Sequence, residues 1–395
     1  MDRLFAQDLP ESVIKRLSIE AKRLGAINFG QGIPPFPTAP HIIAAARRAL
    51  DETDIGVYPN FLGSLELRQA IGKKLSVDPE KNILVTVGAM EATATAILSI
   101  VETGDRVGVI TPDYCNHFPE IQLARGTIVE IPMKEGERWQ LDLVGIEKEA
   151  KAGMRLLIFT NPNNPTGAVA SGDELKQLVE LAKRYGFWLL SDETYSFLTY
   201  GQKAVSLLDF WNDYDQLLVV RSFSKEYAMT GWRVGYLIAQ KDALHVCAKT
   251  HDALVGCAPK ISQIAAHAAI AGSQTVVDDY RKQYATLRQI TLDALARSKE
   301  ISFAPPQGAY YLFFRYSEPE HSVQLADRIL AQAKVAVVPG SVFGQAGEGH
   351  LRISFAADEA ILREGLARLV SFFQEVVLFI CIIGISFVDW YHKRV

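Results

Sequence analysis

Three polar segments of this sequence each follow a short apolar run. They are 161–167 (NPNNPTG), 191–195 (SDETY) and 221–225 (RSFSK). If the apolar runs are parallel strands, the segments meet at the carboxyl edge of one sheet, where open α/β sheets bind their ligands. The set then combines asparagine, carboxylate, tyrosine and serine groups with the primary amine of Lys225. A lysine amine loses its proton readily when it is desolvated or near other cations, so it can serve as nucleophile, leaving group and proton carrier.

Taken singly, each segment has a structural explanation. Asn-Pro and Pro-Thr-Gly are common turn sequences, Asp192 could cap a helix, and a lysine beside a serine is usually a solvated surface residue. Unrelated loops would not place all of these groups after successive strands in this order. We therefore interpret the three segments as parts of one site for a polar ligand.

The elements that must position these segments alternate between strands and helices. We expect strands at 82–87, 106–110, 156–160, 187–190, 217–220 and 234–239. We expect helices at 90–101 and 171–185, the second with Ser171 as its N-cap and Glu174 three residues further on. This alternation predicts an α/β fold with a mainly parallel sheet.

After about residue 275 the pattern changes and predicts a smaller α+β domain. Its expected elements are a charged helix, two short strands and a closing helix, at 276–298, 308–314, 334–338 and 358–373. The expected division of the chain is an N-terminal arm with part of the small domain at 1–40, a large domain at 41–275, the small C-terminal domain at 276–375, and an atypical apolar tail at 376–395.

The tail is the least usual part of the sequence. Residues 376–388 (VVLFICIIGISFV) are all apolar or small, and Trp390, Tyr391, Lys393 and Arg394 follow them. The aromatic and basic flank resembles that of a membrane anchor, but the run falls short of the roughly 20 residues that span a bilayer. We expect a buried element here, with a membrane contact or a segment of non-native reading frame as the alternatives.

Composition limits the class of protein. The 395-residue chain is 49% hydrophobic and 22% charged, as in an ordinary globular protein of about two domains. A net charge of −4 without long runs of Lys or Arg excludes a nucleic-acid-binding surface, so the expected partner is a small molecule. Cys115, Cys247, Cys257 and Cys381 lack the paired spacing of a disulfide framework or a zinc site, and no metal is expected. The N-terminus has no apolar signal segment, and a cytoplasmic location is expected.

The motifs together resemble the class I and II aminotransferase family. The resemblance rests on the three polar segments, on Arg233 eight residues past Lys225, and on 27–32 (INFGQG) and 351–355 (LRISF). It covers all but about the last twenty residues of the chain. It implies a fold type I transferase that uses pyridoxal 5'-phosphate, with a seven-stranded, mainly parallel sheet flanked by helices in the large domain. The subgroup implied is that of the aspartate, aromatic and kynurenine aminotransferases.

The resemblance implies a role for each matching residue around the cofactor ring. Lys225 would form the Schiff base with the cofactor and, once substrate has displaced it, would carry the proton that defines transamination. Asp192 would pair with the pyridine nitrogen and keep it protonated. Tyr195 and Asn164 would donate to the 3'-oxygen of the cofactor. Tyr114 would stack on the ring face, with a core tyrosine as the alternative.

The cofactor's phosphate would be bound beside the turn Gly88-Ala89-Met90. This turn follows a strand and opens a helix, so its N–H groups and the helix dipole can face an anion. Ser222, Ser224 and Arg233 would add two hydroxyls and a fixed positive charge. Tyr58 resembles a family residue that reaches the phosphate from the neighbouring subunit, which implies a homodimer.

The implied substrates are an L-amino acid and a 2-oxo acid. Arg352 would bind the α-carboxylate because arginine offers a planar two-point fork, with Gly32 and Asn164 beside it. A surface ion pair is the alternative role of Arg352. The same framework also supports a C–S β-lyase or a cyclopropane-forming synthase, and a non-catalytic cofactor-binding sensor is a more remote alternative.

The substrate side chain is expected to be neutral, aromatic or sulfur-containing rather than that of aspartate. Aspartate-using relatives place a lysine two residues beyond the glycine that aligns with Gly88, where this chain has Met90. Ile33 and Tyr114 add apolar surface nearby. A basic side chain stays open as a further possibility.

Overall fold

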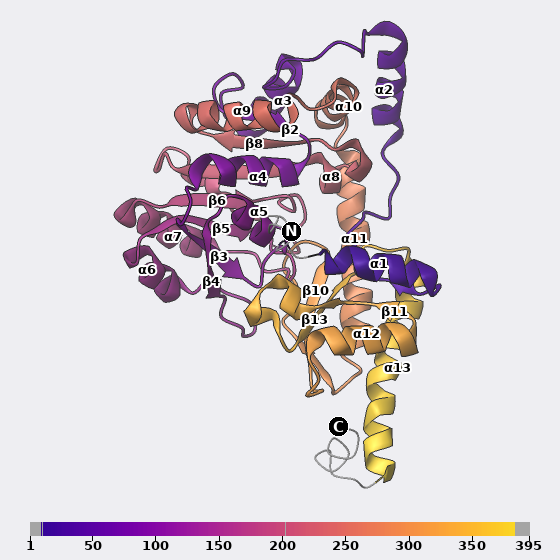
Figure 1. Ribbon diagram of the computed structural model, residues 1–395. Helices are drawn as coiled ribbons and strands as arrows, with labels where there is room; N and C mark the ends of the chain where they lie inside the picture. The colour runs from indigo at the N-terminus through magenta and orange to yellow at the C-terminus, as the bar shows by residue number, and fades with distance from the viewer. Residues whose placement is uncertain (1–8, 10, 202, 384–395) are drawn as a thin grey trace, which may run out of the picture.

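The structure is a computed structural model that describes residues 9, 11–201 and 203–383. Its strands form one seven-stranded, one four-stranded and one two-stranded sheet. Figure 1 shows the large sheet with its helices in the upper part of the molecule and the two smaller sheets below, with helix α11 (Thr275–Leu295) running alongside both parts.

The large sheet confirms the predicted α/β fold. Its strands, in spatial order, are β2 (Ile83–Thr86), β8 (Gly235–Ala239), β7 (Leu217–Ser222), β6 (Trp188–Asp192), β5 (Met154–Thr160), β3 (Arg106–Thr111) and β4 (Thr127–Pro132). Only β8 is antiparallel to its neighbours β2 and β7, and the remaining neighbours pair in parallel. Strand β4 is not among the expected strands, because it is a partly exposed edge strand without a continuous apolar run.

Each central strand buries both of its faces, as expected for a parallel sheet covered by helices. Leu156 and Ile158 of β5 point into an apolar cluster on one face, while Leu157 and Phe159 point into a cluster on the other. The first face is covered by α4 (Ala89–Ile100), α5 (His117–Leu123) and α9 (Lys241–Val255). The second cluster includes side chains of α2 (Pro40–Glu52), α3 (Leu65–Leu75), α6 (Leu143–Lys151), α7 (Gly172–Tyr185) and α10 (Lys260–Ala271).

The smaller sheets join the two ends of the chain. The four-stranded sheet is antiparallel, in the order β12 (Val338–Pro339), β13 (His350–Ser354), β10 (Tyr311–Tyr316) and β9 (Ile301–Phe303). The two-stranded sheet pairs β1 (Ile27–Asn28) with β11 (Val335–Ala336), so the N-terminal arm lies against the C-terminal part. Helices α1 (Val13–Arg23) and α12 (Ser322–Ala333) pack beside these strands. The exact domain boundaries stay a prediction.

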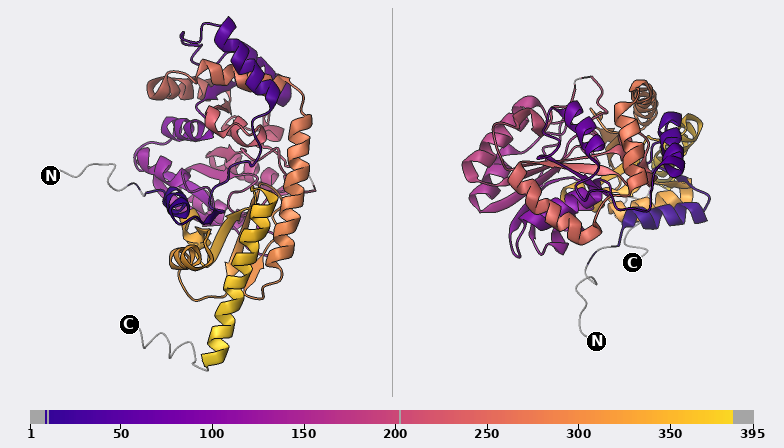
Figure 2. Two further views of the ribbon diagram at one scale, coloured as in Figure 1. Left: turned by 90° about the vertical axis from the view of Figure 1, so that its right-hand side faces the viewer. Right: turned by 90° about the horizontal axis from the view of Figure 1, so that it is seen from above.

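Two local expectations can be compared directly with the structure. Ser171 caps α7 in a complete capping box with Glu174, as predicted. The closing helix α13 (Glu359–Ile383) begins near the expected residue but continues past 373 into the apolar tail, and it projects beyond the rest of the molecule (Figures 1 and 2). The remainder of the tail, 384–395, lies outside the described residues. Among the residues that the structure describes, no helix has both the length and the apolarity for a bilayer crossing.

Candidate active site

The three polar segments meet at the carboxyl edge of the large sheet. Strand β5 ends at Thr160 beside Asp192, the last residue of β6, and Asp192 in turn lies beside Val220 of β7. The backbone N–H of Asn161 donates to the carbonyl of Asp192 at 2.9 Å, and that of Glu193 donates to the carbonyl of Val220 at 2.8 Å. These bonds fix the residues that follow the three strands relative to one another.

Lys225 lies on α8 (Phe223–Glu226), the short helix that follows β7. Its Nζ donates to the backbone carbonyl of Gly32 at 2.6 Å. Burial, together with the positive charges of Arg233 and Arg352, lowers the pKa of this amine to about 8, against a smaller opposing effect of Asp192. The structure therefore brings the lysine, the carboxylate and both arginines into one electrostatic neighbourhood.

The lowered pKa predicts how the cofactor-free protein reacts with an aldehyde. The Lys225 amine is protonated and not nucleophilic below its pKa, so the rate of bond formation should rise with pH through a midpoint near 8. For a lysine with the ordinary pKa of 10.5, the midpoint of the rise in rate would lie at that pH instead. Stopped-flow absorbance after addition of pyridoxal 5'-phosphate, between about pH 6 and about pH 11, measures this midpoint. A midpoint near 10 would contradict the prediction.

The Asp192 side chain accepts two hydrogen bonds from Thr194 and is influenced by the charge of a nearby histidine. Its Oδ1 accepts from the backbone N–H of Thr194 at 2.9 Å and from the Thr194 hydroxyl at 2.6 Å. Burial raises the pKa of Asp192, and nearby His117 opposes that increase. Burial alone would lower the pKa of His117, but Asp113, 3.5 Å away, together with Glu120 and Asp192 raises it to about 9. A buried imidazolium therefore favours the charged form of Asp192.

Thr194 and His117 are not among the residues expected from the sequence. Thr194 follows Asp192 by two positions, the spacing of a turn in which an Asp side chain bonds to the backbone. His117 follows Tyr114 by three positions, or about one helical turn. Both spacings are common in proteins, so neither signal would have singled out these residues.

The aromatic residues of the site keep their protons. The hydroxyl of Tyr114 accepts from Nδ2 of Asn116 at 2.8 Å, and the hydroxyls of Tyr195 and Tyr311 share a 2.8 Å hydrogen bond. Burial, with the negative charge of Asp192 as a smaller contribution, raises the pKa of both Tyr114 and Tyr195. Both side chains are therefore neutral phenols that can donate a hydrogen bond at ordinary pH.

Arg352 is a buried cation on β13, only 2% exposed. It donates from Nη1 to Oδ1 of Asn164 at 2.9 Å and from Nη2 to the carbonyl of Gly30. Its guanidinium lies over the rings of Tyr311 and Phe343, 4.5 and 4.9 Å from the ring centroids. None of the ion pairs within the described ranges includes Arg352. A buried guanidinium held by neutral groups is well suited to a carboxylate ligand.

A second positive region lies at the start of α4. Gly88 is the N-cap of this helix, with φ 78°, and provides no side-chain cap, so the first N–H groups of the helix remain available to an anion. A β-carbon at Gly88 would collide with the guanidinium of Arg233. Arg233 also donates from Nη2 to the carbonyl of Val87 at 3.4 Å. The hydroxyl of Ser222 accepts from the backbone N–H of Ser224 at 3.1 Å on the adjoining turn.

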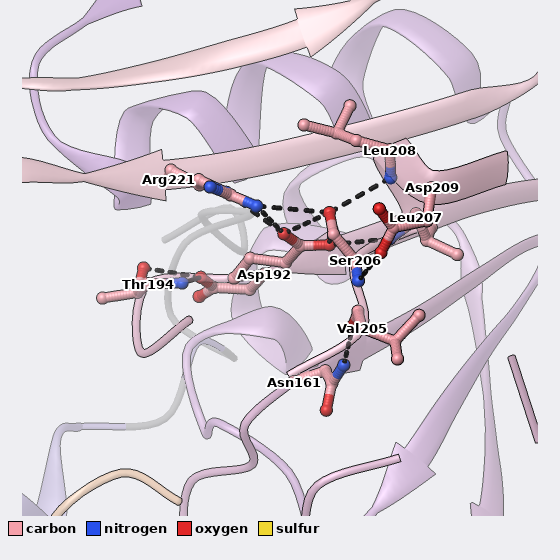
Figure 3. A network of polar contacts seen from close by, with 10 residues as sticks. Asn161, Asp192, Thr194, Val205, Ser206, Leu207, Leu208, Asp209 and Arg221 are labelled. Carbon is pink, nitrogen blue, oxygen red and sulfur yellow. Dashed lines mark hydrogen bonds and ion pairs between the residues drawn. The ribbon is translucent and has the colours of Figure 1, made fainter. Parts of the chain in front are cut away.

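A buried ion pair joins the ends of two neighbouring strands at this edge of the sheet. Nη2 of Arg221 lies 2.7 Å from Oε2 of Glu193, and the Ser206 hydroxyl donates to the same carboxylate. Figure 3 shows Arg221 and Ser206 converging next to Asp192. Because Glu193 follows Asp192 and Arg221 precedes Ser222, the pair ties together the strand ends that carry two predicted site residues.

Gly32 and Tyr58, two further residues of the predicted site, differ in how far they are enclosed by the rest of the chain. The Gly32 carbonyl accepts from Lys225 and, at 2.9 Å, from the hydroxyl of Tyr310, and a β-carbon at Gly32 would collide with the Tyr311 hydroxyl. Tyr58 is 89% exposed on the surface of the single chain. Its predicted contact therefore depends on a second copy of the protein.

Comparison with known proteins identifies the family. The family model for aminotransferase class I and II matches residues 25–369. The chain belongs to this family. The aminotransferase is 34% identical over 359 residues to a probable aspartate aminotransferase of Methanocaldococcus jannaschii, covering 88% of this chain and 93% of that protein. It is 31% identical over 376 residues to aromatic-amino-acid aminotransferase 2 of Thermococcus litoralis, covering 93% and 96%.

The fold agrees with that of solved family members. A crystal structure of an aspartate aminotransferase from Thermotoga maritima has a TM-score of 0.87 and 31% sequence identity, and the match covers 94% of this chain and 99% of that one. The family and the fold type I architecture expected from the sequence are thereby confirmed.

Members of this family use pyridoxal 5'-phosphate, and the residues of this chain fit that group. The carboxyl group of Asp192 suits the ring nitrogen, and the amine of Lys225 suits the aldehyde carbon. The glycine-capped start of α4 and Arg233 suit the phosphate. Since a side chain at Gly88 would displace Arg233, the glycine itself belongs to this fit.

Proposed function

We propose that this aminotransferase moves the amino group of an L-amino acid to a 2-oxo acid, with neutral, aromatic or sulfur-containing amino acids favoured over aspartate. The observation that carries the proposal is the buried Lys225 amine, whose pKa is lowered to about 8 by burial and by Arg233 and Arg352. One of these arginines suits a carboxylate and the other a phosphate. An amine within the electrostatic reach of both would suit chemistry on an amino acid with the help of a phosphorylated cofactor.

We assign the following work to the residues. When bound, the cofactor supplies a ring that accepts electrons from the substrate α-carbon. With the cofactor bound, the Lys225 amine would be the group that moves the proton released at the substrate α-carbon. Asp192 would accept a hydrogen bond from the protonated ring nitrogen of the bound cofactor, and the Tyr195 hydroxyl would donate to its 3'-oxygen. Arg352 holds the α-carboxylate, while Asn164, whose Oδ1 accepts from Arg352, keeps its Nδ2 for the 3'-oxygen.

The surroundings of Arg352 support the proposed side-chain preference. Phe343, which contacts the guanidinium, belongs to an apolar cluster with Trp139 and Phe313, and Cys115 packs against that cluster. The position at which aspartate-using relatives carry a lysine is occupied by Met90, whose Sδ accepts from Nδ2 of Asn116 at 3.4 Å. A second carboxylate bound here without its own cation would lose hydration without compensation.

This preference predicts a measurable order of amino donors. With one 2-oxo acid acceptor, we expect kcat/KM for phenylalanine or methionine to exceed that for aspartate by about tenfold or more. Met90→Lys is the matched variant, because it places a cation where aspartate users have one, and it should raise the aspartate value selectively. A tenfold preference of the wild-type protein for aspartate would overturn the proposed substrate class.

Three alternative functions would use the same cofactor site. A C–S β-lyase or a cyclopropane-forming synthase would differ in its products, since neither passes the amino group to an acceptor. A non-catalytic sensor would bind amino acids without turnover. A screen of donors against acceptors, with oxo acid and ammonia both measured, separates the transferase from the lyase directly.

We further propose a cytoplasmic homodimer in which Tyr58 reaches the phosphate site of the neighbouring copy. Tyr58 is 89% exposed, and Val57 and Phe61 of the same loop are exposed apolar residues that a second copy would cover. Cys115 and Cys247 are free thiols, which suits a reducing compartment.

A further inference from the structure

The mostly buried carboxylate of Glu91, in the first turn of α4, bonds to the backbone just before that helix. Oε2 of Glu91 accepts from the backbone N–H of Val87 at 3.0 Å, and Val87 is the residue before the N-cap Gly88. Oε1 of Glu91 accepts from the hydroxyl of Thr95 and lies 3.0 Å from Nδ1 of His251. An ionised carboxylate oxygen only accepts hydrogen bonds, which assigns the donor role in this contact to Nδ1 of His251.

The pair of Glu91 and His251 is costly to bury. The His251 side chain, on α9, is fully buried, and that of Glu91 is 11% exposed. Nε2 of His251 has no hydrogen-bond partner within the part of the chain that the structure describes. Replacing such buried pairs by apolar residues is often neutral for stability. Stabilisation alone therefore does not explain this arrangement.

One oxygen of Glu91 bonds to the backbone of the residue that precedes the turn. Glu91 accepts from the N–H of Val87, while Arg233 approaches the carbonyl of the same residue at 3.4 Å. Val87 is thereby fixed at both of its backbone polar groups, immediately before the first free N–H groups of α4. The orientation of those N–H groups follows from the orientation of this residue. The donors His251 and Thr95 also offset the negative charge that Glu91 brings close to an anion site.

We propose that Glu91 and His251 are positioning residues for the turn 88–90 and that they set how tightly the cofactor's phosphate is bound. This inference rests on the proposed function, in which the turn binds that phosphate. The pair acts through the Val87 backbone and not by touching the cofactor. Its effect is therefore specific to ligands that carry a phosphate.

The test compares two ligands that differ only in the phosphate. The dissociation constants of cofactor-free protein for pyridoxal 5'-phosphate and for pyridoxal are measured in wild type, Glu91→Gln and His251→Leu. We expect the constant for pyridoxal 5'-phosphate to rise about tenfold or more in both variants, and that for pyridoxal to change by less than about twofold. His251→Asn, which keeps an N–H donor near the position of Nδ1, should restore most of the affinity.

Ser99→Ala is the matched structural control. The Ser99 hydroxyl bonds to that of Thr250 at 2.8 Å and also joins α4 to α9, but far along the helix from the turn. We expect this variant to bind both ligands as wild type does. Equal weakening of both ligands, or no change in affinity for pyridoxal 5'-phosphate, would overturn the inference. If Glu91→Gln does not fold, His251→Leu and His251→Asn decide the question between them.

The same measurements distinguish a failure of the proposed function from a failure of this inference. If wild-type protein binds pyridoxal 5'-phosphate no more tightly than pyridoxal, the phosphate site itself is wrong. If wild type discriminates strongly between the two ligands but the variants do so equally well, only the positioning role is wrong.

Discussion

Lys225→Ala abolishes amino-group transfer: we expect kcat to fall by at least about a thousandfold. The substitution removes one amine with two functions, since Lys225 would be both the nucleophile for the cofactor's aldehyde carbon and the carrier of the substrate α-proton. Steady-state rates with phenylalanine and a 2-oxo acid measure the loss. The visible absorbance of protein loaded with pyridoxal 5'-phosphate should change in the same variant, because the covalent link to the lysine is absent.

Lys74→Ala provides the matched control for this loss. Lys74 is a partly exposed lysine of α3. Its Nζ lies 2.6 Å from Oε1 of Glu226, which is on the same short helix as Lys225, and donates to the Tyr227 hydroxyl at 3.0 Å. Such a pair contributes little, so we expect kcat to change by less than about twofold. Full activity of Lys225→Ala would end the proposed mechanism.

Arg352→Ala should lower kcat/KM for amino acids by about 30-fold to several thousandfold, the equivalent of about 2–5 kcal/mol for an unpaired buried carboxylate. The substrate α-carboxylate loses its two-point partner, while the phosphate site at Gly88 and Arg233 stays intact. Arg352→Lys keeps the charge but not the planar fork, and should recover only part of the loss. Kinetics with both variants measure the difference.

Two observations separate this effect from damage to the fold. Arg315→Ala removes an arginine from β10, the strand next to β13, where Arg315 pairs with Glu135 at the surface. We expect it to leave kcat/KM within about twofold of wild type. The cofactor dissociation constant of Arg352→Ala should also stay near the wild-type value. A variant that lost cofactor and substrate binding together would point to misfolding rather than to a missing carboxylate partner.

The sequence predicts much of the site because reactive residue types stand directly after apolar runs. Asp192 and Lys225 follow runs that the structure places on adjacent strands, β6 and β7, so their proximity follows from parallel pairing alone. The capping box of Ser171 and Glu174 is equally local. In each case the prediction depends on contacts within a few residues or between neighbouring strands.

Other features depend on packing between distant elements, which no local pattern encodes. Glu91 meets His251 because α4 and α9 lie side by side on the same face of the sheet. The lack of an acidic partner for Arg352 within the described ranges becomes visible only when its surroundings are known. Strand β4 is not predicted for a different reason: an edge strand that is partly exposed to solvent needs no continuous apolar run.

A single-turnover experiment tests the proposed transamination most directly. Protein loaded with pyridoxal 5'-phosphate is mixed with excess phenylalanine and no 2-oxo acid, and oxo acid and ammonia are both quantified. We predict one equivalent of oxo acid per active site, no ammonia, and an amino group retained by the protein until a 2-oxo acid is added. Continuous release of ammonia without an acceptor, or no oxo acid from any amino donor, would contradict amino-group transfer by this protein.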